Sequence, residues 1–161
     1  MLPSNEQIRD AENSRIGHPK TVRAFAMAIA YQPYGVNAII ANVAWEVEFT
    51  DEFEEWWHTL SESEQGKVDA RVKLLMERGP NLGFPFSSQV QTSRFPEMRE
   101  LRAQAGGDPL RMLYAFDPQR IAILLLGGDK TGDNRWYETN VPIADRLFEL
   151  HLRNIKEEGS G

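Results

Sequence analysis

The stretch RIAILLLGGDKTGDNRWY, residues 120–137, decides the fold. Its apolar run is too short to cross a membrane and has the length of a buried strand. The run ends at a Gly-Gly pair, and Lys130 and Tyr137 follow it. A rigid strand that ends in an open loop is a common way to present working side chains. The stretch therefore predicts a core strand, followed either by a plain polar turn or by a functional loop.

Composition bounds the class of protein. A chain of 161 residues with 41% hydrophobic residues predicts one domain, with room for an appendage. The absence of cysteine excludes disulfides and cysteine-based zinc sites, and it is compatible with a cytoplasmic location. The net charge of −6 argues against bulk attraction to nucleic acid. Residues 94–137 hold seven basic and six acidic side chains, so we expect a local anion site there instead of a broad basic face.

Residues 44–161, which contain this stretch, predict one domain. Residues 1–43 predict an N-terminal extension without a sustained pattern. Alternating residues over 45–49 indicate a strand. A helix follows, capped by Thr50 or Asp51, and a second helix opens with a capping box at Ser61 and ends near Gly79. The apolar faces of these two helices are formed by Phe53, Trp56, Trp57, Leu60, Val68, Val72 and Leu75.

The second half of the chain predicts an antiparallel meander. Residues 80–96 are rich in Pro, Gly and Ser and predict a loop. Strands are expected at 98–103, 110–116 and 120–128, with turns at 106–109 and 117–119. The last two strands are apolar on both faces, so the helical hairpin covers one face and a helix from about Pro142 to Lys156 covers the other. The predicted class is α+β, in the order β-α-α-β-β-β-α, and the last helix turns Ala144, Leu147, Phe148 and Ile155 inward.

Four side chains are expected to converge at one side of this sheet: Arg102, Arg111, Lys130 and Tyr137. Alternation puts Met98, Glu100 and Arg102 on one face of their strand. Arginine offers a fork of donors that matches a phosphate, and a tyrosine can act as a general base where cations lower its pKa. Such a group suits metal-free cleavage of RNA, whose 2′-hydroxyl is a built-in nucleophile.

Each of these residues also has a plain structural explanation. Arg102 can form a surface ion pair with Glu100, and Arg111 can pair with an acid or a carbonyl. Lys130 can be a solvated turn residue, and Tyr137 can cap the core. Other motifs fail: GGDKTG lacks the glycine spacing of a phosphate loop, DKTGDN lacks the Gly and Glu of a calcium loop, and the three histidines lack zinc spacing. We therefore expect neither a metal nor a cofactor.

The element order, together with FTDEFEEWWHTL, MRELR, LRMLYAF and IAILLLGGDKT, resembles the phage-related HigB-like branch of the RelE toxin superfamily. The resemblance covers about residues 45–155. It implies a toxin of a type II toxin–antitoxin system that enters the ribosomal A site and cuts mRNA, as a metal-independent endoribonuclease. By position it implies catalytic roles for Arg102, Lys130 and Tyr137. It implies RNA contacts from Arg94, Arg111 and Arg135.

The resemblance also implies partners. A helix-turn-helix antitoxin of the HigA kind would neutralise the toxin and carry the complex to operator DNA. The ribosome and mRNA would be the targets, and in some systems of the family a chaperone takes part. The sequence departs from the family in its acidic charge, in the missing lysines of the loop over residues 80–96, and in the missing histidines that some HigB members use near the C-terminus. Two alternatives stay open: a ParE-like gyrase poison, and a catalytically silent module that binds the antitoxin as a corepressor.

Overall fold

The computed structural model describes residues 20–21 and 45–161 of the chain. Within these residues, six strands form one sheet in the spatial order β1-β2-β6-β5-β4-β3. The strands are β1 (Lys20–Thr21), β2 (Val47–Phe49), β3 (Ser87–Gln89), β4 (Met98–Ala105), β5 (Asp108–Phe116) and β6 (Ala122–Asp129). The helices are α3 (Asp51–Thr59), α4 (Glu62–Arg78) and α5 (Trp136–Gly159), with a 3-10 turn η2 (Gly79–Asn81). The predicted α+β class is confirmed.

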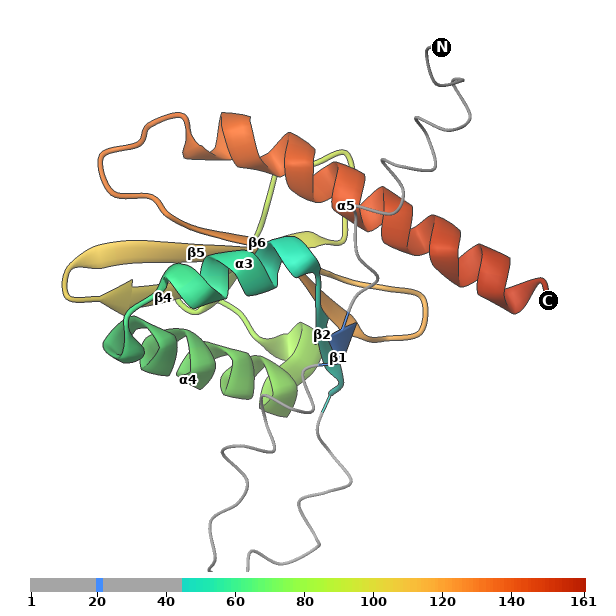
Figure 1. Cartoon of the computed structure of the whole chain (residues 1–161), viewed down its shortest axis with the longest axis horizontal. Helices are drawn as coiled ribbons and strands as arrows, with labels where there is room; N and C mark the ends of the chain where they lie inside the picture. The colour runs from blue at the N-terminus through green and yellow to red at the C-terminus, as the bar shows by residue number, and fades with distance from the viewer. Residues whose placement is uncertain (1–19, 22–44) are drawn as a thin grey trace, which may run out of the picture.

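The sheet lies between two helical layers (Figure 1). α3 and α4 pack against one face, and α5 packs against the other. Each face has its own core: Phe53, Val72 and Tyr114 belong to the first, and Leu113, Ile123 and Phe148 belong to the second. The prediction that the hairpin and the last helix cover opposite faces is therefore confirmed.

One part of the predicted N-terminal extension, residues 1–43, joins this sheet. β1 pairs antiparallel with β2, and β2 in turn pairs parallel with β6. The rest of the extension, residues 1–19 and 22–43, lies outside the described residues.

The helical hairpin follows the sequence closely because its caps are local. Thr50, and not Asp51, is the N-cap of α3: its hydroxyl accepts from the Phe53 amide at 3.1 Å and donates to the Leu125 carbonyl at 2.6 Å. The same hydroxyl thus ties the start of α3 to β6. Ser61 and Glu64 form both halves of the predicted capping box of α4.

The meander differs from the prediction mainly at its first turn. β4 and β5 extend to Ala105 and from Asp108, so the hairpin turn consists of Gly106 and Gly107 alone. Both have positive φ, at 58° and 95°, which glycine adopts without steric cost. This tight turn fixes the register that pairs Arg102 with Arg111.

The predicted loop over residues 80–96 is wrong in part, because it contains β3 and η2. β3 reads Ser-Ser-Gln and shows no apolar alternation, so its sequence carries no strand signal. Tertiary contacts stabilise it instead: it pairs antiparallel with β4, and the buried Ser87 hydroxyl lies 2.7 Å from the Tyr114 hydroxyl of β5.

The predicted start of the last helix is also wrong. α5 begins at Trp136, so Pro142 lies inside the helix and not in its first turn. Ala144, Leu147 and Phe148 are buried as predicted, whereas Ile155 is only partly buried. The earlier start moves Tyr137 from the predicted loop into the first turn of α5.

The Gly-Gly pair that ends the apolar run has a packing role in β6. Gly127 and Gly128 are strand residues, and their missing side chains make room for two tryptophans. A Cβ atom on Gly127 would overlap the Trp56 ring of α3, and one on Gly128 would overlap the Trp136 ring of α5. The pair therefore lets a helix approach the sheet on each face.

Candidate active site on the face under α5

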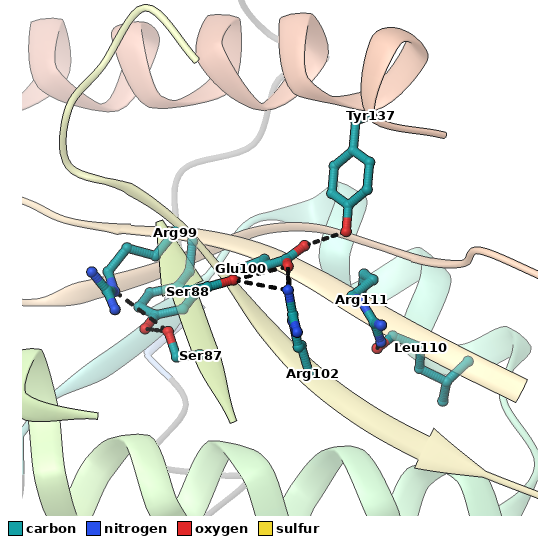
Figure 2. Close-up of polar contacts among 9 residues, drawn as sticks. Ser87, Ser88, Arg99, Glu100, Arg102, Leu110, Arg111 and Tyr137 are labelled. Atoms are coloured by element: carbon teal, nitrogen blue, oxygen red, sulfur yellow. Dashed lines mark hydrogen bonds and ion pairs between the residues drawn. The ribbon is translucent and has the colours of Figure 1, made fainter. Parts of the chain in front are cut away.

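Glu100 is the centre of a polar cluster between β4 and the first turn of α5. It is 3% exposed. One carboxylate oxygen accepts from Arg102, whose nearest guanidinium nitrogen lies at 2.7 Å, and from the Ser88 hydroxyl at 3.0 Å. The other accepts from the Tyr137 hydroxyl at 2.6 Å. Figure 2 shows Tyr137 reaching down from α5 to this carboxylate.

Burial and hydrogen bonding act in opposite directions on Glu100. Burial by itself raises the pKa of the carboxyl, because it disfavours the charged form. Hydrogen bonds from Tyr137, Arg102 and Ser88, together with the charge of Arg102, outweigh burial and lower the pKa below its ordinary value. Glu100 is therefore a carboxylate at neutral pH.

Tyr137 responds to the same contact in the opposite sense. Burial raises the pKa of its phenol, and the hydrogen bond to Glu100 and the charge of Glu100 raise it further. Arg111 opposes this rise without cancelling it. The condition under which Tyr137 would serve as a general base, a pKa lowered by nearby cations, is thus not met. At neutral pH the phenol keeps its proton and is a hydrogen-bond donor.

Arg111 lies beside this contact, opposite Arg102 in the β4–β5 register and opposite Gly128 in β6. One guanidinium nitrogen donates to the Leu110 carbonyl at 3.0 Å, as the structural explanation of this residue predicted. Its Nε atom is buried without a hydrogen-bond partner. Arg111 therefore has donor capacity that the described protein atoms do not use.

Lys130 completes the cluster from the loop after β6. Its ammonium lies 5.0 Å from the centroid of the Tyr137 ring, within cation–π range. Its amide donates to the Pro109 carbonyl at 3.0 Å, which holds the loop against β5. Asp129 and Asp133 shape this loop, because their carboxylates accept from amides two residues ahead.

The predicted convergence of Arg102, Arg111, Lys130 and Tyr137 is thus observed. Three cations share the site with one carboxylate, so the local charge is positive although the chain carries −6. The excess suits an anion such as a phosphodiester, and arginine and lysine are the side chains that bind it.

Two predicted RNA contacts lie outside the cluster. Arg94 forms an ion pair with Glu149 of α5 at 2.8 Å, and it is half-exposed. Arg135 precedes α5, is largely exposed, and lies 3.8 Å from Glu138. Both are available at the surface, but neither is held by the Glu100 network.

Sequence reasoning missed the importance of Glu100 and Ser88. Glu100 was expected only as a surface partner of Arg102, whereas it is buried and joins three donors. A signal was present: a single acid shares its strand face with Arg102. Ser88 carried no signal, because its strand was predicted as loop.

Within the described residues, the histidine and acidic side chains form no group of three or more that is placed to hold a metal ion. In the same part of the chain, none of the helices combines the length and the apolar character that a membrane span requires.

A helical hairpin, an antiparallel meander, a covering C-terminal helix and a basic cluster on the sheet define the RelE-like toxin fold. The chain belongs to the family described as "Phage derived protein Gp49-like (DUF891)", whose profile matches residues 55–149. The match contains every residue of the cluster. It confirms the expected kinship with phage-related HigB-like toxins.

Two curated relatives come from Mycobacterium tuberculosis (strain ATCC 25618 / H37Rv). The chain is 45% identical over 109 residues to the protein named "Putative toxin HigB3". The aligned region covers 67% of this chain and 92% of that relative. It is 35% identical over 132 residues to "Putative toxin HigB2", and this aligned region covers 79% of this chain and 65% of that relative. The chain thus spans slightly less than two thirds of the second relative.

Proposed function

We propose that this protein is the toxin of a type II toxin–antitoxin system and that it cleaves mRNA in the ribosomal A site. Both relatives carry HigB toxin names. The observation that carries the proposal is the cluster itself, in which Arg102, Arg111 and Lys130 surround the Glu100–Tyr137 contact. Cations and a phenol on a rigid sheet are the parts that phosphodiester cleavage requires.

In this reaction the 2′-oxygen attacks phosphorus, the bond to the 5′-oxygen breaks, and charge builds on the phosphorane. Arg102 and Arg111 bind the phosphate oxygens, and Lys130 offsets the added charge. Tyr137 keeps its proton at neutral pH. When its hydroxyl turns from Glu100 to the leaving 5′-oxygen it donates that proton, and water returns a proton to the phenolate. The 2′-proton passes to water, because the lowered pKa of Glu100 makes this carboxylate a weak base. Rate acceleration then rests on charge stabilisation and on protonation of the leaving group.

The proposal extends to partners and place. We assign a helix-turn-helix antitoxin as the neutralising partner. The complex binds operator DNA only through this antitoxin. A chaperone that acts on the antitoxin is compatible with this scheme. A ribosomal substrate requires a cytoplasmic location. The exposed Arg94 and Arg135 contact the RNA backbone outside the cluster, where they supply affinity and not chemistry.

Induced expression with and without Lys130→Ala tests the proposal. The unaltered chain should arrest growth and leave mRNA ends within codons, and Lys130→Ala should relieve the arrest. Lys73→Ala is the matched control, because Lys73 lies on α4 and pairs with Asp69 at 3.3 Å, on the opposite face of the sheet. Arrest with DNA breaks and intact mRNA would instead identify a gyrase poison.

One observation favours the catalytically silent alternative. Glu100 engages Arg102 and raises the pKa of Tyr137, so two proposed catalytic groups already have partners within the protein. A corepressor that only binds its antitoxin would tolerate this arrangement. Expression without growth arrest, combined with tight antitoxin binding, would support it.

A further inference from the structure

Phe84 stands out because it is a large apolar side chain in water. Among the described residues, it is the only large hydrophobic residue that is exposed to solvent, at 79% exposure. Its position is nevertheless fixed: the Gly83 carbonyl accepts from the amides of Phe86 and Ser87 at 3.0 Å each, which closes a turn around it. The next aromatic residue, Phe86, packs against the core beneath Arg71. The same short segment therefore turns one ring inward and holds the other outward.

The exposed ring lies beside the cluster. The Arg102 guanidinium lies 5.5 Å from the centroid of the Phe84 ring, within cation–π range. The same guanidinium contacts Glu100 and donates to the Ser88 hydroxyl at 3.1 Å. One side chain thus joins the ring to the anion site. Because Arg102 lies over one face of the ring and the residue is 79% exposed, most of the remaining ring surface is open to a planar ligand.

We propose that Phe84 is a stacking platform for a nucleobase of the single-stranded RNA, next to the nucleotide whose phosphate binds in the cluster. This inference rests on the proposed function. Proteins that hold single strands combine a cationic track for the backbone with aromatic rings on which bases stack. Phe84 and Arg102 supply these two parts side by side. Because every base has a π-face, the platform adds affinity without choosing the base.

Ribosomes programmed with a defined mRNA give the test, with kcat/KM for cleavage as the readout. Phe84→Ala should lower kcat/KM by roughly 5- to 150-fold, the range expected for loss of one stacked base. Phe84→Leu should lose nearly as much, because it keeps apolar bulk without a ring. Phe84→Trp should retain activity. The thermal midpoint should stay unchanged in all three variants, because the ring contributes little buried area.

An mRNA with a single abasic position sharpens the test. At the stacked position, base removal should reproduce the loss seen with Phe84→Ala, and the two changes together should cost no more than either alone. Fully additive losses at every position would overturn the platform. So would unchanged cleavage by Phe84→Ala combined with weakened antitoxin binding, which would make Phe84 a protein contact. A wild-type chain that cuts no mRNA would contradict both the proposed function and the stacking platform. Equal cleavage by wild type and Phe84→Ala would contradict the stacking platform alone.

Discussion

Two buried acids contact α5: Glu100 of the sheet at the first turn of the helix, and Asp117 beside the sheet farther along it. Glu100 of β4 accepts from Tyr137 in the first turn at 2.6 Å. Asp117, just after β5, lies 2.8 Å from the His151 ring in the second half of the helix. Both acids are buried, at 3% and 5% exposure. By depth and geometry alone, the two contacts look equivalent.

Their surroundings differ. The oxygens of Asp117 are occupied by the Gln119 and Ile121 amides and by His151, whose ring stacks on Phe148. These partners belong to the adjoining turn and to α5, so the network closes on itself. Glu100 instead faces half-exposed cations that outnumber it. Burial of an acid therefore does not distinguish a structural contact from one in the proposed active site. The surplus positive charge around Glu100 and the access of those cations to solvent make that distinction.

Replacement of Asp117 should have the largest effect on stability. Asp117→Ala leaves two turn amides and a buried histidine without their acceptor, so we expect the free energy of unfolding to fall by about 3 kcal/mol. Cleavage per folded molecule should be unchanged. Urea unfolding followed by tryptophan fluorescence measures the first quantity. Asp133→Ala is the control, since this exposed aspartate also accepts from a turn amide. Equal losses in the two variants would contradict the structural role of the closed network.

Glu100→Gln should cost less stability but affect the chemistry. The variant keeps the shape and an acceptor oxygen, so we expect a loss of about 2 kcal/mol at neutral pH. With the carboxylate gone, the pKa of Tyr137 should fall toward its ordinary value of 10.0, although burial still raises it. Ultraviolet titration of tyrosine, with Tyr137→Phe subtracted, measures this fall. An unmoved pKa would show that Glu100 does not set the state of the phenol.

The pH dependence of the Glu100 contact follows from the direction in which the pKa of Glu100 shifts on folding. The pKa of Glu100 is lowered in the folded protein from a value of 4.5. A lowered carboxyl pKa contributes stability that is fully present above the unfolded pKa and is lost as pH falls through the folded pKa. The stability difference between wild type and Glu100→Gln should therefore be constant around pH 6 and shrink below about 4.5. A difference that stays constant in acid would contradict the assigned shift.

The sequence predicted the parts of this molecule that local patterns determine. The caps at Thr50 and Ser61, the inward faces of α4 and α5, and the meander all follow from spacing and turn residues. The convergence of Arg102 with Arg111 was also within reach, because a two-glycine turn leaves one register for the hairpin.

What the sequence could not predict depends on contacts between distant residues. β3 forms because its serine-rich segment pairs with β4 and is hydrogen-bonded to Tyr114. Gly127 and Gly128 are explained by two tryptophans on separate helices. The pKa of Tyr137 was expected to fall, since the cations near it were foreseen. The burial of Tyr137 itself and its hydrogen bond to Glu100, which together raise this pKa, were not predicted.

The smallest expected effect concerns Glu149, a half-exposed acid on α5 itself. It pairs with Arg94 at 2.8 Å and with Arg153 at 3.6 Å, and the hydrogen bond from Arg94 leads in lowering its pKa. Because an exposed ion pair adds little to folding, Arg94→Ala should leave the unfolding midpoint unchanged. If Arg94 contacts the RNA backbone, its removal should reduce the salt dependence of single-stranded RNA binding by about 0.7 in log–log slope. Arg153→Ala, which breaks the other bond to Glu149, should leave that slope unchanged. Equal slopes for both variants and wild type, measured by fluorescence anisotropy across a salt series, would show that Arg94 does not contact the RNA.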